Sequence, residues 1–186
     1  MSKTWSPDVY LKAFQFAAAA HQGQTLAGSP QPYILHICMV AMEVISALRD
    51  DPACDGDLAV QCALLHDVVE DTSVSLADIE REFGPHVAAG VAALTKDAAL
   101  PKHDRMADSL RRIQRQPREV AFVKLADRIN NLREPPPHWN AAKQAEYLAE
   151  AGVILAALGA AHPGLAARLA AKMQEYPRFA AEKTSA

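Results

Sequence analysis

The sequence predicts an all-α fold. Signals that begin and end helices recur along its 186 residues, and apolar residues between them return every three or four positions. No stretch alternates apolar and polar residues over the length of a strand. No internal repeat or linker divides the chain, so we expect one domain that spans residues 1–186.

Capping residues, prolines and glycines bound the expected helices. Ser6 is a candidate N-cap for a helix that opens at Pro7. Ser75, with Asp78 three residues later, forms a variant of the capping box, and Asn140 is another N-cap candidate. After the first helix, a loop reads GQTLAGSPQP. The later helices are expected at residues 33–48, 58–69, 76–83, 85–95, 104–115, 117–134, 141–158 and 165–172.

The composition excludes several classes of partner. Asp and Glu number 22 against 19 Lys and Arg, so the net charge is −3 and attracts neither nucleic acid nor an acidic membrane. The first residues lack the apolar centre of a signal peptide, and no apolar run reaches the length of a bilayer span. The three cysteines are odd in number and lack C-x-x-C spacing, which favours a reduced, cytoplasmic location. The oligomeric state stays open.

Four side chains are candidate metal ligands: His36, His66, Asp67 and Asp127. His66 and Asp67 are adjacent in ALLHDVVEDT, whose Leu and Val residues are typical of the buried side of a helix, and Asp127 lies in the equally apolar FVKLADRINNL. Charged groups are costly to bury unless they are paired or bind a metal. Two imidazoles and two carboxylates suit a divalent first-row metal such as Mn²⁺, with Fe²⁺ or Zn²⁺ less favoured.

Two further acids follow the His-Asp pair. Glu70 lies four residues after His66, which would place it one turn along the same helix face, and Asp71 comes at the expected helix end. These carboxylates can accept a proton from water, position the water or protonate a leaving group. Asn131 lies one turn after Asp127, where its amide can orient the ligand carboxylate or contact a substrate.

Each of these residues also has a purely structural interpretation. His36 alone is typical of a hydrogen-bonded helix residue, and Asp127 alone can pair with Lys124 or Arg128. Glu70 and Asp71 alone can form a solvated helix end. The joint order favours chemistry, because a His precedes His-Asp, an acidic pair follows three residues on, and a last Asp lies inside an apolar helix.

These residues resemble the HD-domain metal-dependent phosphohydrolases, and more closely the hydrolase domain of the RelA/SpoT alarmone family. AAAAHQGQ, PYILH, ALLHDVVEDT, FG, LTKD, LPK and VKLADRINNLR occur in the family's order, from about Phe14 to Arg133. The combination is highly specific, although the dipeptide His-Asp by itself is not. The resemblance is to the small members that carry only the hydrolase, and it implies an HD-domain helical bundle.

The resemblance also implies an activity. A Mn²⁺ ion would be held by the four candidate ligands, and Glu70 and Asp71 would be the catalytic acidic pair. The implied substrate is a phosphorylated guanine nucleotide, and the reaction is hydrolysis of (p)ppGpp to GDP or GTP and pyrophosphate, with water attacking the 3′ phosphate. Five residues are expected to contact the substrate: Tyr33 beside the nucleoside, Lys102 at a phosphate, Asn131 facing the substrate, and Lys143 and Tyr147 at the phosphate or sugar.

The chain departs from the family pattern in one substrate region. The family usually carries an Arg-Lys pair just after GQ, whereas this loop reads GQTLAGSPQPY without a basic residue. Separately, Ile37 replaces the usual Pro after the first ligand His, which we interpret as a structural variation. A cation there would form charge-assisted contacts with a nucleotide. Three alternatives therefore stay open: hydrolysis of another nucleotide, such as the 2′-phosphate of NADPH, a non-catalytic nucleotide sensor, and a metal-free helical interaction module.

Overall fold

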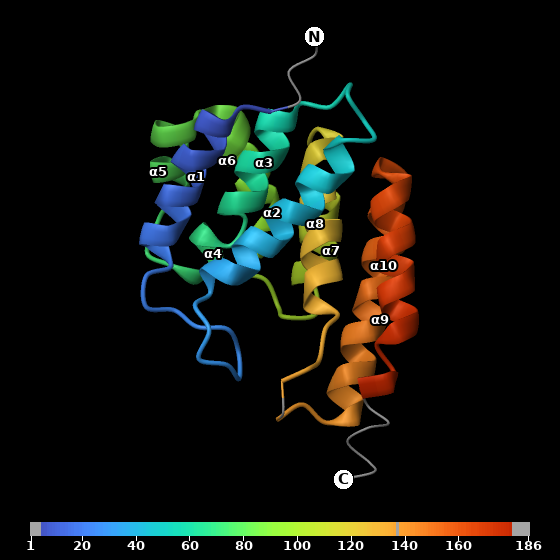
Figure 1. The fold of residues 1–186 in the computed structure, drawn as a ribbon. Coiled ribbons are helices and arrows are strands. Elements are labelled where there is room, and N and C mark those ends of the chain that lie inside the picture. The colour runs from blue at the N-terminus through green and yellow to red at the C-terminus, as the bar shows by residue number, and fades with distance from the viewer. Residues whose placement is uncertain (1–4, 137, 180–186) are drawn as a thin grey trace.

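A computed structural model describes residues 5–136 and 138–179 as a bundle of helices (Figure 1). Within these residues no β-strand forms, and the β pairing is an isolated bridge between Thr25 and Pro32. The all-α expectation is confirmed. The helices in chain order are α1 (Pro7–Ala20), α2 (Ile34–Leu48), α3 (Gly56–Leu65), α4 (Val68–Asp71), α5 (Leu76–Phe83), α6 (Pro85–Leu94), α7 (Arg105–Ile113), α8 (Arg118–Asn131), α9 (Ala141–Leu158), the 3₁₀ turn η1 (Gly159–Ala161) and α10 (Pro163–Glu175).

Helix α8 forms the centre of the bundle. Every residue from Glu119 to Asn130 is buried, because α2, α3, α6, α7, α9 and α10 all contact it. Its buried charges have partners: Glu119 accepts a hydrogen bond from the backbone of Asp55 at 2.8 Å, and Arg128 pairs with Glu150 at 2.7 Å. Because α8 is buried on every side, its charged side chains need such partners inside the bundle.

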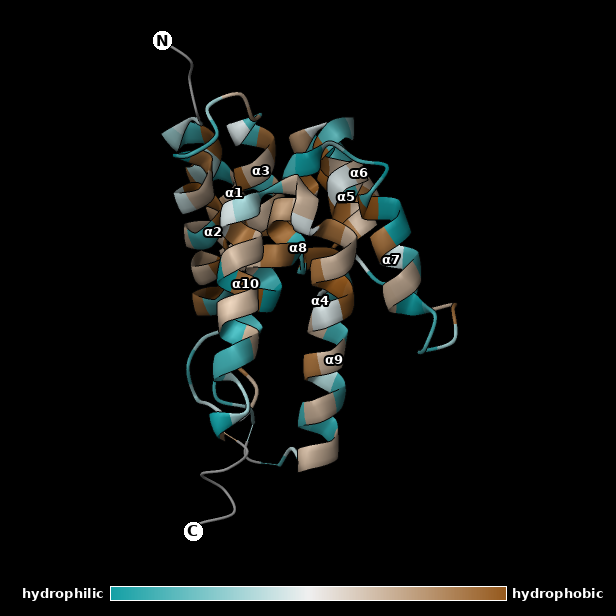
Figure 2. Cartoon of the chain, turned by 90° about the vertical axis from the view of Figure 1, so that its right-hand side faces the viewer, coloured by the Kyte–Doolittle hydropathy of each residue, from teal (hydrophilic) through white to brown (hydrophobic). Residues whose placement is uncertain are grey.

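The other helices cover α8 in two groups. α1 and α2 pack against α3, while α5 and α6 pack against each other, and α9 lies beside α10 on the opposite flank (Figure 1). Apolar residues concentrate where helices face one another, as the brown colouring in Figure 2 shows. Burying these apolar faces supplies the main stabilising contribution to the fold. Among the described residues, no helix is both long and apolar enough to span a bilayer.

The helix caps test the local sequence signals. The capping box of α5 is confirmed, since Ser75 accepts from the backbone of Asp78 and Asp78 accepts from the backbone of Ser75. Asn140 caps α9 as expected. Ser6 precedes α1, but its side chain makes no capping bond; its backbone N–H instead donates to Asp57 at 2.5 Å. Ser6 is therefore the N-cap residue of a helix that opens at Pro7, as expected, but its side chain does not supply the cap.

The expected helix 58–69 is interrupted, which corrects the sequence interpretation. α3 ends at Leu65, and the one-turn helix α4 begins at Val68. His66 Nδ1 hydrogen-bonds the carbonyl oxygen of Ala63 at 2.8 Å, the acceptor that a continuous helix would offer to the N–H of Asp67. Glu70 therefore lies on a separate helix rather than on the same continuous helix face as His66.

Two helix bounds at the end of the chain also differ from expectation. The last helix was expected at 165–172, but α10 runs from Pro163 to Glu175. The side chain of His162 accepts a hydrogen bond from the N–H of Leu165 at 3.1 Å and so caps this helix. The earlier start was missed because His is not among the residues that usually signal an N-cap.

Candidate active site

Three elements bring the candidate metal ligands together. His36 lies in the first turn of α2, His66 and Asp67 occupy the break between α3 and α4, and Asp127 comes from the central helix α8. The break is decisive because it directs two adjacent side chains toward one point, whereas neighbours on an α-helix point about 100° apart. Both imidazoles are buried, with 5% of His36 and 4% of His66 exposed.

The ligand atoms face one another at short range. Nε2 of His36 lies 3.6 Å from Oδ2 of Asp67 and 3.4 Å from Oδ1 of Asp127. Nε2 of His66 lies 3.0 Å from Oδ2 of Asp67 and 3.9 Å from Oδ1 of Asp127. One ligand atom each from His36, His66 and Asp67 lie within 4.8 Å of one another. Asp127 completes this group by facing both imidazoles.

The chemistry of this donor set fits a divalent cation. His66 donates its Nδ1 proton to the Ala63 carbonyl, so the neutral form of this imidazole carries its lone pair on Nε2, the nitrogen that faces the carboxylates. That nitrogen is buried and has no hydrogen-bond partner, a costly arrangement that a bound metal would remove. A backbone carbonyl on the far nitrogen is also the usual way in which a metal-binding His is oriented.

The pKa values of the cluster respond to its mutual charges. Burial alone lowers the pKa of His36, but hydrogen bonds and charges from Asp127 and Asp67 outweigh burial and raise this pKa to about 9. Burial raises the pKa of Asp67 and Asp127, yet the neighbouring cationic groups hold both well below the usual carboxyl range. The carboxylates are therefore ionised, which is the form that binds metal.

Further side chains fix the two carboxylates. The hydroxyl of Tyr33 donates to Oδ2 of Asp67 at 2.6 Å. Lys124 pairs with Oδ2 of Asp127 at 3.1 Å, so the structural pairing considered for Asp127 exists alongside its place in the cluster. Asn131 donates to the other oxygen of Asp127 at 2.5 Å, the carboxylate-orienting contact expected from its spacing. Tyr33 thus lies against a ligand carboxylate, where the resemblance implied contact with a nucleoside.

The acidic pair opens onto the same small cavity. This cavity of about 160 Å³ is lined mainly by polar side chains, and Asp67, Asp127, Glu70 and Asp71 are all among its lining residues. The remaining lining residues are Tyr33, His66, Leu94, Lys96, Lys124 and Asn131. Ligand candidates and acid–base candidates therefore share one space, as hydrolysis of a bound phosphate ester requires.

Asp71 is held from the loop that follows α1. The side-chain amide of Gln24 donates to the Asp71 carbonyl at 2.7 Å, and its oxygen accepts from Nδ1 of the buried His21 at 2.7 Å. The Tyr33 hydroxyl lies 3.4 Å from the Asp71 carboxylate. Burial and the charges of Asp67 and Glu70 raise the pKa of Asp71. Gln24 was not among the expected site residues, although it belongs to the quoted GQ motif.

Glu70 contacts a residue that the sequence interpretation also missed. Oε2 of Glu70 accepts from the backbone N–H of Lys96 at 2.9 Å, and Oε1 accepts from the Lys96 ammonium at 2.8 Å. Lys96 lies just beyond α6 within the quoted LTKD motif, which is the signal that marked this position. Its partner is 26 residues away, so local sequence carries no sign of the contact.

Three other expected substrate residues lie outside the small cavity. Lys102 is exposed in the connection between α6 and α7, and Lys143 pairs with Glu146 at 2.8 Å. Tyr147 packs under the guanidinium of Arg128, 4.0 Å from the ring centroid. Tyr147 therefore packs against Arg128, and none of the three residues lines the small cavity.

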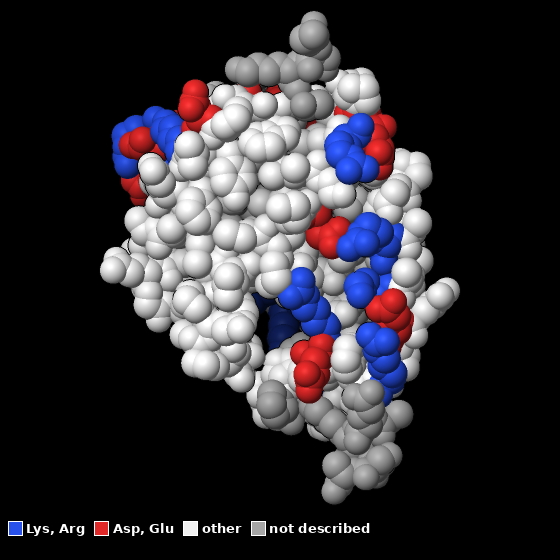
Figure 3. Space-filling model, viewed as in Figure 1, with Lys and Arg blue, Asp and Glu red and all other residues white. Residues whose placement is uncertain are grey.

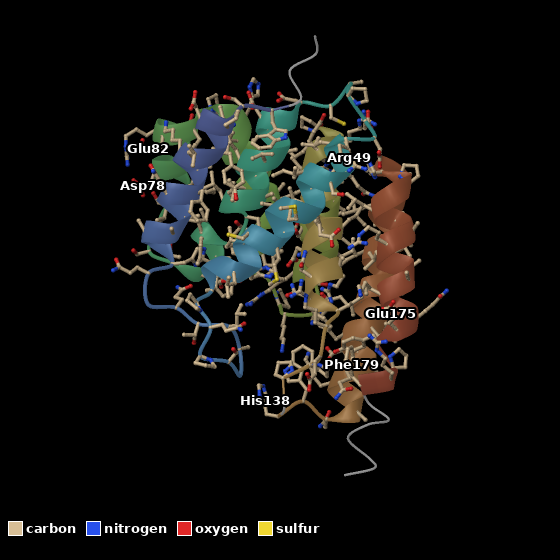
Figure 4. The ribbon with its side chains drawn as sticks, viewed as in Figure 1. Arg49, Asp78, Glu82, His138, Glu175 and Phe179 are labelled. Carbon is tan, nitrogen blue, oxygen red and sulfur yellow. The ribbon has the colours of Figure 1, made fainter. Side chains whose placement is uncertain are left out.

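A second, larger pocket adjoins the cluster. It measures about 610 Å³ and runs between the loop after α1 and the end of α8, with His36 and Asn131 in its wall. Figure 3 shows a hollow in the lower part of the surface, with Lys and Arg side chains beside it and in its depth. Among the described lining residues, Arg133 is the one Lys or Arg. Figure 4 labels His138, which lies between α8 and α9 at the lower end of the bundle.

Comparison with known proteins agrees with this fold. The family model described as HD domain matches residues 13–166. The chain belongs to the HD-domain family, as its motifs led us to expect.

Within that family the chain is similar to small hydrolases. It is 32% identical over 150 residues to the Drosophila melanogaster guanosine-3′,5′-bis(diphosphate) 3′-pyrophosphohydrolase MESH1, covering 77% of this chain and 81% of the relative. The Danio rerio MESH1 is 34% identical over 159 residues, covering 82% and 86%. A solved structure of a metazoan ortholog of SpoT that hydrolyses ppGpp aligns with a TM-score of 0.74 and 28% identity, over 94% of this chain and 96% of its own.

Proposed function

We propose that this protein is a metal-dependent (p)ppGpp 3′-pyrophosphohydrolase that releases pyrophosphate and GDP or GTP. The observation that carries this proposal is a metal-ligand cluster that shares one polar cavity with Glu70 and Asp71. The adjoining 610 Å³ pocket offers room for the organic part of a substrate whose reacting phosphate enters the small cavity. The named activities of the MESH1 relatives support the choice of substrate.

The metal would be held by His36, His66, Asp67 and Asp127. We propose Mn²⁺ as the ion, since mixed imidazole and carboxylate donors suit it; Fe²⁺ and Zn²⁺ are the less favoured alternatives. When bound, the ion supplies Lewis-acid stabilisation of charge on phosphate oxygens and makes water easier to deprotonate. The chain's own part is to hold the donor side chains in place, and the hydroxyl of Tyr33 orients Asp67.

Glu70 and Asp71 divide the proton transfers in this proposal. Glu70 accepts the proton of the attacking water, because its carboxylate lines the cavity and is held by Lys96. Asp71 protonates the leaving 3′ oxygen, since burial and the neighbouring acids raise its pKa and favour its protonated form. The P–O bond to the 3′ oxygen breaks as water adds to phosphorus, and the proton from Asp71 completes the nucleotide product.

The proposed substrate contacts divide between the small cavity and the larger pocket. Tyr33 and Asn131 line the cavity and would meet the reacting phosphate, while Asn131 also borders the larger pocket that would receive the nucleoside. Lys102, Lys143 and Tyr147 are proposed at the outer phosphates and sugar. These three residues lie in the same region of the molecule: Lys102 and Lys143 both lower the pKa of Glu146, and Glu146 precedes Tyr147 in the sequence. We expect the enzyme to act on a free nucleotide in the cytoplasm, without nucleic acid or membrane.

A panel of substrates tests the proposal. The purified protein is stripped of metal, restored with Mn²⁺, and given ppGpp, pppGpp and NADPH in separate reactions. We expect pyrophosphate from the two alarmones, and none before metal is restored. Orthophosphate from NADPH alone would replace the proposed substrate, and nucleotide binding without any product would make the protein a sensor.

One observation favours NADPH as the second candidate. The loop wall of the larger pocket, Leu26 to Gln31, carries no charged side chain, so the pocket offers fewer cations than the family pattern implies. A nucleotide with fewer phosphates at its reacting end would lose less binding free energy when these cations are missing. A higher turnover of NADPH than of ppGpp would support this alternative.

A further inference from the structure

We propose that Lys96 is the positioning residue for Glu70 in the hydrolytic step. This inference rests on the proposed function in so far as Glu70 acts on the attacking water. The contact joins residues from two elements, the end of α6 and the one-turn helix α4, and it occupies both oxygens of one carboxylate. By binding both oxygens, Lys96 sets where the Glu70 carboxylate lies relative to the reacting phosphate.

Helix α4 cannot fix the position of Glu70 by itself. It has four residues, which is a single turn, and isolated helices of that length are unstable in water. Val68, the first residue of α4, is buried and anchors the turn. The side chain of Glu70 still has several bonds about which it can rotate. The orientation of the carboxylate must therefore come from contacts outside α4.

Lys96 supplies those contacts from two directions. Its backbone N–H binds Oε2 at 2.9 Å, and its ammonium binds Oε1 at 2.8 Å. A single ion pair at a surface contributes little, since both side chains stay free to move. Here a fixed backbone donor holds one oxygen, so the ammonium has only the remaining oxygen to orient. The two side chains are also partly shielded, at 37% and 28% exposure for Lys96 and Glu70.

The backbone of Lys96 is itself held by the neighbouring helix. Arg112 of α7 donates to the carbonyl of Thr95 at 2.9 Å and to that of Ala92, while Asp108 pairs with Arg112 at 2.7 Å. These bonds use carbonyls at the end of α6 that have no partner within the helix. Lys96 thereby connects the end of α6 and helix α7 to the carboxylate of Glu70.

The location of Lys96 links this contact to the chemistry. Lys96 lines the small cavity together with Asp67, Asp127 and the acidic pair. Burial lowers the pKa of Lys96, but the hydrogen bond to Glu70 and the charges of Glu70, Asp127 and Asp67 outweigh it and raise this pKa. The ammonium thus stays charged beside Glu70, and both hydrogen bonds from Lys96 to Glu70 persist at neutral pH.

Kinetics of three variants test the inference on whichever nucleotide the wild-type protein hydrolyses. Lys96→Ala removes the ammonium but keeps the backbone donor, and we expect kcat to fall by about 10- to 100-fold with little change in KM, because small displacements of a reacting group have effects of this size. Lys96→Arg should recover most of the lost rate. Lys172→Ala is the control, since it removes a lysine that also pairs with a glutamate at 2.8 Å, far from the cavity.

A crystal structure of Lys96→Ala gives a readout that does not depend on activity. We expect the Glu70 carboxylate to leave its wild-type position while the side chains of His36, His66, Asp67 and Asp127 keep theirs. An unmoved Glu70 with unchanged kcat would overturn the inference, and so would a raised KM with unchanged kcat, which would make Lys96 a substrate contact. If the wild-type protein did not hydrolyse ppGpp, the proposed substrate would be refuted but the role of Lys96 would not, since the position of Glu70 is measured without substrate.

Discussion

At the residue scale, three of the four candidate ligands have a partner outside the ligand set that orients them. His66 is fixed by the Ala63 carbonyl, and Asp67 by the hydroxyl of Tyr33. Asp127 is fixed by Lys124 and Asn131, one on each oxygen. Such partners keep the donors aligned before a metal arrives, which reduces the ordering cost of binding it.

Asp127→Asn should separate metal binding from folding. We expect the affinity for Mn²⁺ to fall by more than about 100-fold, since a ligand matters more than the outer partners whose loss costs up to that factor. Stability should fall as well, because the ammonium of Lys124, 9% exposed, loses its carboxylate. Calorimetric titration with Mn²⁺ and urea unfolding measure the two effects.

The double variant Asp127→Asn with Lys124→Met is the matched control. It removes the buried charge that the single variant leaves unpaired, so stability should recover while Mn²⁺ binding stays lost. Wild-type Mn²⁺ affinity in either variant would remove Asp127 from the ligand set. Glu70→Gln should differ from both, by keeping metal affinity and losing turnover.

The sequence allowed the candidate ligands and the nearby contacts of Asp127 with Lys124 and Asn131 to be predicted, but not the contacts made by residues far away along the chain. His36, His66, Asp67 and Asp127 were identified because polar ligand types stand in apolar helices in a specific order. Lys96 and Gln24 were missed because their partners lie 26 and 47 residues away. Such contacts arise from the packing of helices, which local patterns do not encode.

At the element scale, the break between α3 and α4 shows how packing overrides a continuous pattern. Leu64, Leu65 and Val68 are buried on both sides of the break, so apolar periodicity alone predicts one helix. The hydrogen bond from His66 to the Ala63 carbonyl and the contacts of Asp67 favour a turn instead. The caps at Ser75 and Asn140 could be predicted, since their partners lie three residues away.

The capping box of α5 makes stability depend on pH in a defined window. Hydrogen bonds from Ser75, together with Arg81, lower the pKa of Asp78 from 3.8 to about 2. The folded pKa is depressed, so the stabilisation is complete above about pH 4 and is lost as the pH falls toward 2. Asp78→Ala should therefore be less stable than wild type at pH 6, and the difference should shrink between pH 4 and 2 in urea unfolding.

Glu80→Ala on the same helix is the control, because it removes an exposed carboxylate whose side chain is not part of the capping box. Its difference from wild type should stay nearly constant over this pH range. A constant difference for Asp78→Ala as well would contradict the capping account.

Gly90 marks a close approach of α6 to its neighbours. A Cβ at this position would lie 2.6 Å from the sulfur of Cys62 and 3.2 Å from a methyl of Val120. Gly90→Ala should destabilise the protein by about 1–3 kcal/mol through overpacking, measured by urea unfolding. Gly152→Ala in α9 is the matched control, since its nearest neighbour is Met173 at 3.6 Å. It should be neutral or stabilise by up to about 1 kcal/mol; equal effects of the two changes would contradict the packing.

At the scale of the whole molecule, two spaces meet at the cluster. The small polar cavity contains the acids, and the larger pocket extends from His36 and Asn131 toward the loop after α1. The all-α class could be predicted from periodicity, and the family from the order of the motifs. The larger pocket could not be predicted, because its walls come from segments about 100 residues apart that only the folded chain brings together.

The most direct test of the central claim is the fate of oxygen during hydrolysis of ppGpp in water enriched in ¹⁸O, with Mn²⁺ restored to the stripped protein. Mass spectrometry should find ¹⁸O in pyrophosphate and none in GDP, because water adds to phosphorus and the 3′ oxygen stays with the nucleoside. Without Mn²⁺, neither product should form. Label in GDP, orthophosphate as the first product, or equal rates with and without metal would contradict the account.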